Sequence, residues 1–262
     1  MAEITNFTAD KLKVRVYETR LEMGAEAAKD VAGKIKELLS RQQVVNIIFA
    51  AAPSQNEFLS SLAAAKEIEW NRVNAFHMDE YVGLDENAPQ RFAHFLAENI
   101  FDKVALKEVF YINGNAEDLQ GECLRYSSLL NQYPVHIVCM GIGENTHIAF
   151  NDPHTADFND PHLVKVVTLD EVSRQQQVHD GCFAALQDVP SSAITLTVPA
   201  LLRANSIYCI VPGSHKAEAV FHTIKSEVTE RYPSTSLKRH GDATLYLDKD
   251  SAAKLDLVKD VL

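Results

Sequence analysis

Hydrophobic residues follow two patterns that alternate along the chain. Between Leu21 and Leu38 they recur every three or four residues, as on one face of a helix. The next segment, residues 44–50 (VVNIIFA), is almost continuously apolar and predicts a buried strand. The alternation continues, with strands expected at 44–50, 73–78, 109–112, 135–140, 164–168, 194–198, 207–211 and 244–247, and helices at 21–38, 56–66, 91–99, 116–131, 215–224 and after Asp250.

Strands that alternate with helices are typical of an α/β fold. We therefore predict one domain over residues 1–262, with a mostly parallel central sheet and helices on both faces, in a doubly wound, Rossmann-like arrangement. In such sheets, ligands bind beyond the carboxyl ends of the strands. We therefore expect the functional residues in the segments that follow Ala50, Met78 and Met140, where three of the expected strands end.

Composition narrows the range of partners. The formal net charge of −11 repels nucleic acid and anionic lipid, so neither nucleic acid nor a membrane is expected as a partner. The 4 cysteines form no CxxC pair and fit no disulfide framework. No apolar N-terminal segment predicts a signal peptide or an anchor, so a cytoplasmic protein is expected. Assembly into a homo-oligomer stays open.

Two carboxylates, Asp79 and Glu80, follow the strand expected at 73–78. A carboxylate on a rigid strand end, partly desolvated beside a cleft, is suited to act as a general base. The alternative is that Asp79 only caps a turn or the next helix. Both interpretations stay open from the residue types alone.

A glycine-rich loop with a histidine follows the strand expected at 135–140. Gly141 and Gly143 allow close backbone approach to a ligand, and His147 lies four residues further on in a polar loop. A dinucleotide site would need GxGxxG at the start of a helix, but position 146 is Thr and Pro153 follows. His147 is therefore a catalytic candidate, with a structural histidine as the alternative.

A third candidate segment, Gly213-Ser214-His215-Lys216, follows the strand expected at 207–211. A helix N-terminus beside a lysine can bind an anion, although Ser214 could equally be an ordinary N-cap. A further stretch is rich in histidine and aspartate: His147, Asp152, His154, Asp157, Asp160 and His162. Its spacing matches no standard zinc pattern, so no metal is expected.

Two long motifs resemble a known enzyme family. Phe76–Leu84 (FHMDEYVGL) and Gly141–Pro153 (GIGENTHIAFNDP) are similar to motifs of glucosamine-6-phosphate deaminase, also called the isomerase. The resemblance extends over most of the chain. The related 6-phosphogluconolactonases typically have Arg where Tyr81 stands and a different ending of the histidine motif. These differences favour the deaminase.

The resemblance implies a function and roles for single residues. His147 would open the sugar ring, Asp79 would move a proton between C2 and C1, and backbone N–H groups around Gly141–Gly143 would bind the enol oxygens. Lys216 matches the family's phosphate-binding lysine, and residues 154–183 fall where the family has a lid. The implied substrate is a phosphorylated amino sugar, converted to a ketose phosphate and ammonia without a cofactor.

Four features depart from the family pattern. Asn145 stands where an aspartate is usual, and Asp152 replaces a glutamate. Ser54 and Gln55 lie where relatives have a glycine-rich phosphate loop, and we expect them to contact the phosphate. His179 aligns with the lid arginine. A changed sugar, such as a galactosamine phosphate, is therefore compatible with the sequence.

Two alternative functions remain at this stage. A sugar-phosphate lactonase would use His147 to activate water and would need no C–H abstraction. A catalytically weakened sugar-phosphate sensor would account for Asn145 and the absent glycine loop. We expect the deaminase.

Overall fold

A computed structural model of the protein describes residues 3–256. One sheet of eight strands runs through it in the spatial order β1 (Glu3–Ala9), β2 (Leu12–Tyr17), β11 (Ala243–Asp248), β10 (Ser206–Val211), β7 (Ile137–Met140), β3 (Val45–Phe49), β4 (Val73–His77) and β6 (Glu108–Phe110). Only the β1–β2 pair is antiparallel, and all other neighbouring strands in this sheet are parallel. The mostly parallel central sheet is therefore confirmed.

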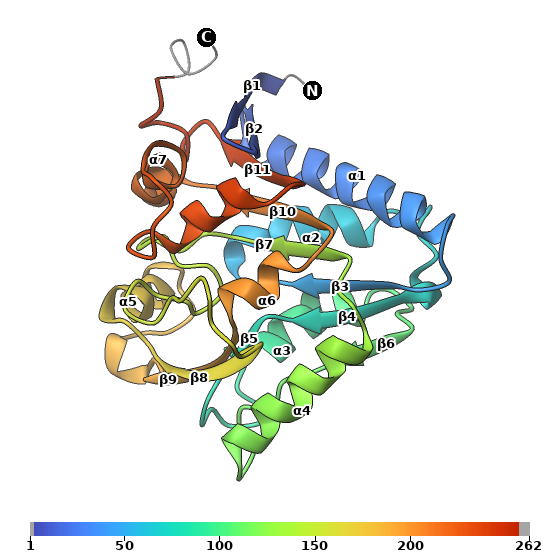
Figure 1. Cartoon of the computed structure of the whole chain (residues 1–262), viewed down its shortest axis with the longest axis vertical. Helices are drawn as coiled ribbons and strands as arrows, with labels where there is room; N and C mark the ends of the chain where they lie inside the picture. The colour runs from blue at the N-terminus through green and yellow to red at the C-terminus, as the bar shows by residue number, and fades with distance from the viewer. Residues whose placement is uncertain (1–2, 257–262) are drawn as a thin grey trace.

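Helices cover both faces of this sheet. Ile47 and Phe49 pack in one hydrophobic core, while Ile48, between them, packs in the other, because successive side chains of a strand point to opposite faces. The first core includes α1 (Arg20–Leu39), α2 (Asn56–Ala63) and α3 (Phe92–Leu96). The second includes α4 (Leu119–Gln132), α6 (Val198–Leu202) and α7 (Ala217–Lys225). This is the doubly wound arrangement expected from the alternating pattern (Figure 1).

A second, smaller sheet was not expected. It contains β5 (Asp79–Tyr81), β9 (Ser192–Leu196) and β8 (Val164–Thr168), all antiparallel. α5 (Glu171–His179) follows β8 directly and lies near this sheet in Figure 1. The small sheet matters for function because β5 begins with Asp79 and is separated from β4 by a single residue.

Several predicted elements differ from the structure. The helix expected after Asp250 is wrong for residues 250–256, which form turns, and its remainder lies outside the described residues. Asp248 accounts for this, because its carboxylate accepts bonds from the N–H groups of Gly213 and Ser251 and so fixes a turn at the strand end. The helix expected at 91–99 ends early as α3 and continues as a π-helical turn, Ala97–Phe101.

The described part of the chain has no helix that is both long and apolar enough to cross a lipid bilayer.

Replacing Gly114 by Ala tests how tightly β5 is held. A Cβ at this position would overlap the backbone carbonyl of Tyr81, whereas a Cβ at Gly33, in α1, would meet nothing. We expect Gly114→Ala to lower the free energy of unfolding by about 2–3 kcal/mol, measured by urea denaturation. The matched control Gly33→Ala should raise it by about 0.5–1 kcal/mol. Equal effects of the two substitutions would contradict the packing described.

Candidate active site

One cavity lies beyond the carboxyl ends of β3, β4, β7 and β10. Each of these strands is followed by a loop that contributes to the wall, because parallel strands place their carboxyl ends at the same edge. The wall contains most of the candidates: Ser54, Gln55, Asp79, Gly141, Gly143, His147 and Lys216. Asn145, Asp152 and His179 are not part of the wall. Gln176 and Gln177, which were not candidates, are.

Asp79 and Glu80 have separate tasks. The Glu80 carboxylate is fully buried and accepts bonds from the N–H groups of Phe92 and Ala93, at the start of α3. The capping role considered for Asp79 therefore belongs to Glu80. Asp79 borders the cavity and is 7% exposed. Burial, reinforced by the neighbouring Glu80 charge, raises the pKa of Asp79 well above its ordinary value.

His77 fixes the backbone of Asp79. The Ile112 N–H donates to Nε2 of His77 over 2.8 Å, so Nδ1 carries the proton of the neutral ring. Nδ1 then donates to the backbone oxygen of Asp79, also over 2.8 Å. Complete burial lowers the pKa of His77 to about 4, so the ring stays neutral at physiological pH. The histidine before the acidic pair is thus structural.

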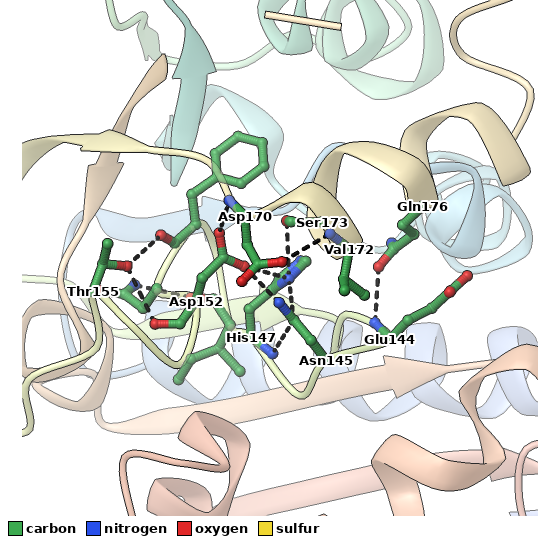
Figure 2. A network of polar contacts seen from close by, with 12 residues as sticks. Glu144, Asn145, His147, Asp152, Thr155, Asp170, Val172, Ser173 and Gln176 are labelled. Atoms are coloured by element: carbon green, nitrogen blue, oxygen red, sulfur yellow. Dashed lines mark hydrogen bonds and ion pairs between the residues drawn. The ribbon is translucent and has the colours of Figure 1, made fainter. Parts of the chain in front are cut away.

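The polar contacts of the His147 imidazole converge on its Nδ1 atom (Figure 2). Oδ1 of Asn145 lies 2.7 Å away, and Oδ1 of Asp152 lies 3.1 Å away. Oγ of Ser173, from α5, is also at 3.1 Å. Amide and carboxylate oxygens only accept, so Nδ1 carries a proton and Nε2 of the neutral ring keeps its lone pair. Nε2 is therefore the atom that can exchange a proton with a ligand.

Asp152 supplies the negative charge that Asn145 lacks. Burial alone would raise the pKa of Asp152. The hydrogen bond and charge of His147, together with the bond from Nδ2 of Asn145, outweigh burial and lower this pKa to about 2. The Asp170 N–H donates to its second oxygen over 3.0 Å. Asn145 thus links the imidazole to the carboxylate, and Asp152 balances a charged imidazole through direct contact.

The loop that carries His147 is tightly wound. A Cβ on Gly143 would overlap the imidazole of His147, so a glycine is required for the ring to lie there. Thr146 and Ala149 adopt left-handed φ values of 71° and 48°, which are unusual for residues with a Cβ. The Gly143 N–H donates to the His147 carbonyl over 2.9 Å. The expectation that this N–H binds an enol oxygen is therefore wrong, because the loop itself uses it.

Ser54, Gln55 and Lys216 form the part of the wall suited to an anion. Lys216 is 2% exposed. Burial lowers the pKa of its ammonium to about 8, although the negative charges of Asp180 and Glu144 act to raise it. Nε2 of Gln55 donates to the Ile210 carbonyl over 3.1 Å and to Oγ of Ser54 over 3.2 Å. Gln55 therefore positions Ser54, and the expectation that its amide donates to the phosphate is not supported.

His179 lies outside the cavity. It is at the end of α5, largely exposed, and its Nδ1 faces Oε1 of Glu144 at 3.4 Å. The helix turns Gln176 and Gln177 to the cavity instead. The sequence offered one signal for them, a run of three glutamines at positions 175–177, but it lies in a segment for which no helix was expected.

Residues 3–256 contain no cluster of histidine, cysteine and carboxylate side chains that could hold an ion. The histidine- and aspartate-rich stretch forms ion pairs instead, such as Lys165 with Asp160 and His154 with Asp170.

The fold is that of a doubly wound α/β protein whose cavity is lined by a carboxylate and an imidazole. Residues 18–246 match the family described as glucosamine-6-phosphate isomerases/6-phosphogluconolactonase. The chain belongs to this family.

Two curated relatives are glucosamine-6-phosphate deaminases. The protein from Streptococcus sanguinis is 33% identical over 236 residues, covering 90% of this chain and 97% of the relative. The protein from Listeria monocytogenes is 34% identical over 211 residues, covering 80% and 88%.

Solved structures agree with this assignment. A monomeric glucosamine-6-phosphate deaminase superposes with a TM-score of 0.83 at 28% identity, over 92% of this chain and 98% of that one. The 6-phosphogluconolactonase of Thermotoga maritima superposes with a TM-score of 0.74 at 17% identity, over 90% and 99%, and shares the fold.

Removing the Asp79 charge should stabilise the fold at neutral pH. The pKa of Asp79 is raised in the folded state. Its ionisation therefore destabilises the folded protein at pH values above the unfolded pKa, about 3.8, and has no effect on stability at lower pH. We expect Asp79→Asn to increase the free energy of unfolding by on the order of 1 kcal/mol at pH 7.5. The gain should vanish near pH 3.5 in denaturant titrations. A gain that is the same at both pH values would contradict a desolvated carboxylate.

Proposed function

We propose that the protein converts a hexosamine 6-phosphate, in the first place glucosamine 6-phosphate, and water to a ketose 6-phosphate and ammonia. The observation that carries this proposal is that Asp79 and His147 line one cavity together with Lys216. A base, a proton carrier and a cation around one small site are the groups that this reaction needs.

His147 is suited to open the sugar ring. In this step the proton of the anomeric hydroxyl moves to the ring oxygen as the bond between C1 and the ring oxygen breaks. Nε2 of His147 accepts and returns that proton, while Asp152 and Asn145 hold Nδ1–H and balance the transient positive charge. Ser173 adds a third contact to the same nitrogen.

Asp79 is suited to the second step. It removes the proton from C2 of the open-chain aldehyde, while a proton of the substrate's C2 ammonium group moves to the carbonyl oxygen, which gives an enolamine. It then returns a proton to C1. The resulting C2 iminium adds water and releases ammonia, leaving a ketone at C2. A desolvated carboxylate with a raised pKa is a stronger base than one in water, and the bond from His77 to its backbone keeps it in place.

The phosphate group fits the other part of the wall. Lys216 supplies the charge, and Ser54 supplies a hydroxyl whose position is set by Gln55. The acidic neighbours Asp180 and Glu144 stabilise the Lys216 ammonium before the ligand arrives.

The contacts of His147 favour an active enzyme over a weakened sensor. Asn145 prompted the sensor hypothesis, yet the imidazole retains a carboxylate partner in Asp152, at 3.1 Å. The lactonase hypothesis rests on a shared fold, and it gives Asp79 no proton to remove from carbon.

Product formation tests the proposal. Incubation with glucosamine 6-phosphate or galactosamine 6-phosphate should release equal amounts of ammonia and ketose phosphate. Asp79→Asn should reduce kcat by about 10²–10⁴-fold and abolish exchange of the C2 hydrogen with deuterated water. The exposed Asp102→Asn is the matched control and should behave like the unmodified protein. Binding of both sugars without turnover would instead indicate a sensor, and hydrolysis of 6-phosphogluconolactone a lactonase.

We also propose that α5, within residues 154–183, acts as a lid. The cavity has a volume of about 60 Å³, well below the roughly 300–1,000 Å³ of small-molecule sites. This favours a movement of α5, which contributes Gln176 and Gln177 to the wall, when a sugar phosphate enters. Bound fructose 6-phosphate should then slow hydrogen exchange of the α5 amides, as mass spectrometry can measure. The amides of α4 provide the control, and unchanged exchange in α5 would exclude a lid.

A further inference from the structure

Gln177 is a largely buried residue whose side-chain amide has no partner within residues 3–256. It is 8% exposed and lines the cavity from α5. No side-chain hydrogen bond links its amide to any residue in the described range 3–256. Its amide atoms are not among the fully buried polar atoms of this range that lack a partner, so the amide stays open to the cavity. The cavity is therefore where this amide can find its partners.

The other glutamines of α5 are different. Oε1 of Gln176 accepts the N–H of Glu144 over 2.8 Å (Figure 2). Its Nε2 donates to Asp180 over 3.2 Å, so the amide is already bonded on both sides. Gln175 is more exposed and is not part of the cavity wall. Of the three, Gln177 alone combines burial, a place on the wall and an amide with no partner among the described residues.

The chemistry of an amide limits what Gln177 can recognise. It presents a donor group and an acceptor oxygen side by side. A phosphate dianion has only acceptors, so it would bond the NH₂ group and leave the carbonyl unsatisfied. A hydroxyl both donates and accepts, and two neighbouring hydroxyls can satisfy both ends of the amide. Lys216 and Ser54 already provide groups for the anion.

We infer that Gln177 is a specificity-determining residue that hydrogen-bonds the hydroxyl groups of the sugar chain. This inference rests on the proposed function for the identity of the ligand. It also gives the lid a part in recognition, because Gln177 reaches the sugar only when α5 covers the cavity. The position that reads the sugar then lies on the lid helix, two residues before His179.

The test compares a sugar phosphate with inorganic phosphate. Gln177→Leu keeps the size of the side chain and removes its amide, and Gln175→Leu makes the same change on the same helix away from the cavity. We expect Gln177→Leu to raise the KM for glucosamine 6-phosphate and the dissociation constant of fructose 6-phosphate by about tenfold. The dissociation constant of inorganic phosphate should change by less than about twofold. Gln175→Leu should alter neither.

Folding and substrate identity are controlled separately. Thermal unfolding checks each variant, and Gln177→Asn, which retracts the amide by one methylene, should give an intermediate affinity. Unchanged sugar binding in Gln177→Leu would overturn the inference, as would an equal loss for inorganic phosphate. If the unmodified protein binds the sugar phosphates but releases no ammonia, the proposed reaction fails while the binding data still decide on Gln177. If it binds neither sugar phosphate, both proposals fail.

Discussion

The site depends on the contact between Nδ1 of His147 and the paired side chains of Asn145 and Asp152. This contact sets the tautomer of the ring and so leaves the lone pair on Nε2. It also joins distant parts of the chain, since Asp152 bonds the Asp170 N–H at the start of α5 and Ser173 reaches the same Nδ1. The orientation of the imidazole and the position of α5 are consequently linked through the buried carboxylate of Asp152.

Much of the fold and part of the site could be predicted from the sequence. Buried parallel strands are short apolar runs, and their carboxyl ends meet at one edge, so the rule for ligand sites led to Asp79, His147 and Lys216. Predicting Asp152 required the family motif, because the segment from His147 to Asp152 turns back on itself through the left-handed backbone of Ala149. No periodicity encodes such turns.

The remaining features depend on tertiary contacts. The small sheet was hidden because β5 has only three residues, and the roles of Asp79 and Glu80 were distinguishable only once α3 was placed over Glu80. α5 is rich in glutamine and weakly amphipathic, so its cavity-facing side chains gave no helical signal. The bond from Gln55 to the Ile210 carbonyl, 155 positions away, likewise has no counterpart in local sequence.

Gly143 has a consequence for how natural variants of this protein should be judged. The imidazole occupies the space that any side chain at this position would fill. A variant with alanine there would retain every acid, base and hydrogen-bonding group of the site, yet its histidine would have to turn away from the ligand. Surveys that score activity by the presence of polar residues would pass such a variant as intact, although it lacks the space, about the size of one methyl group, that the imidazole fills.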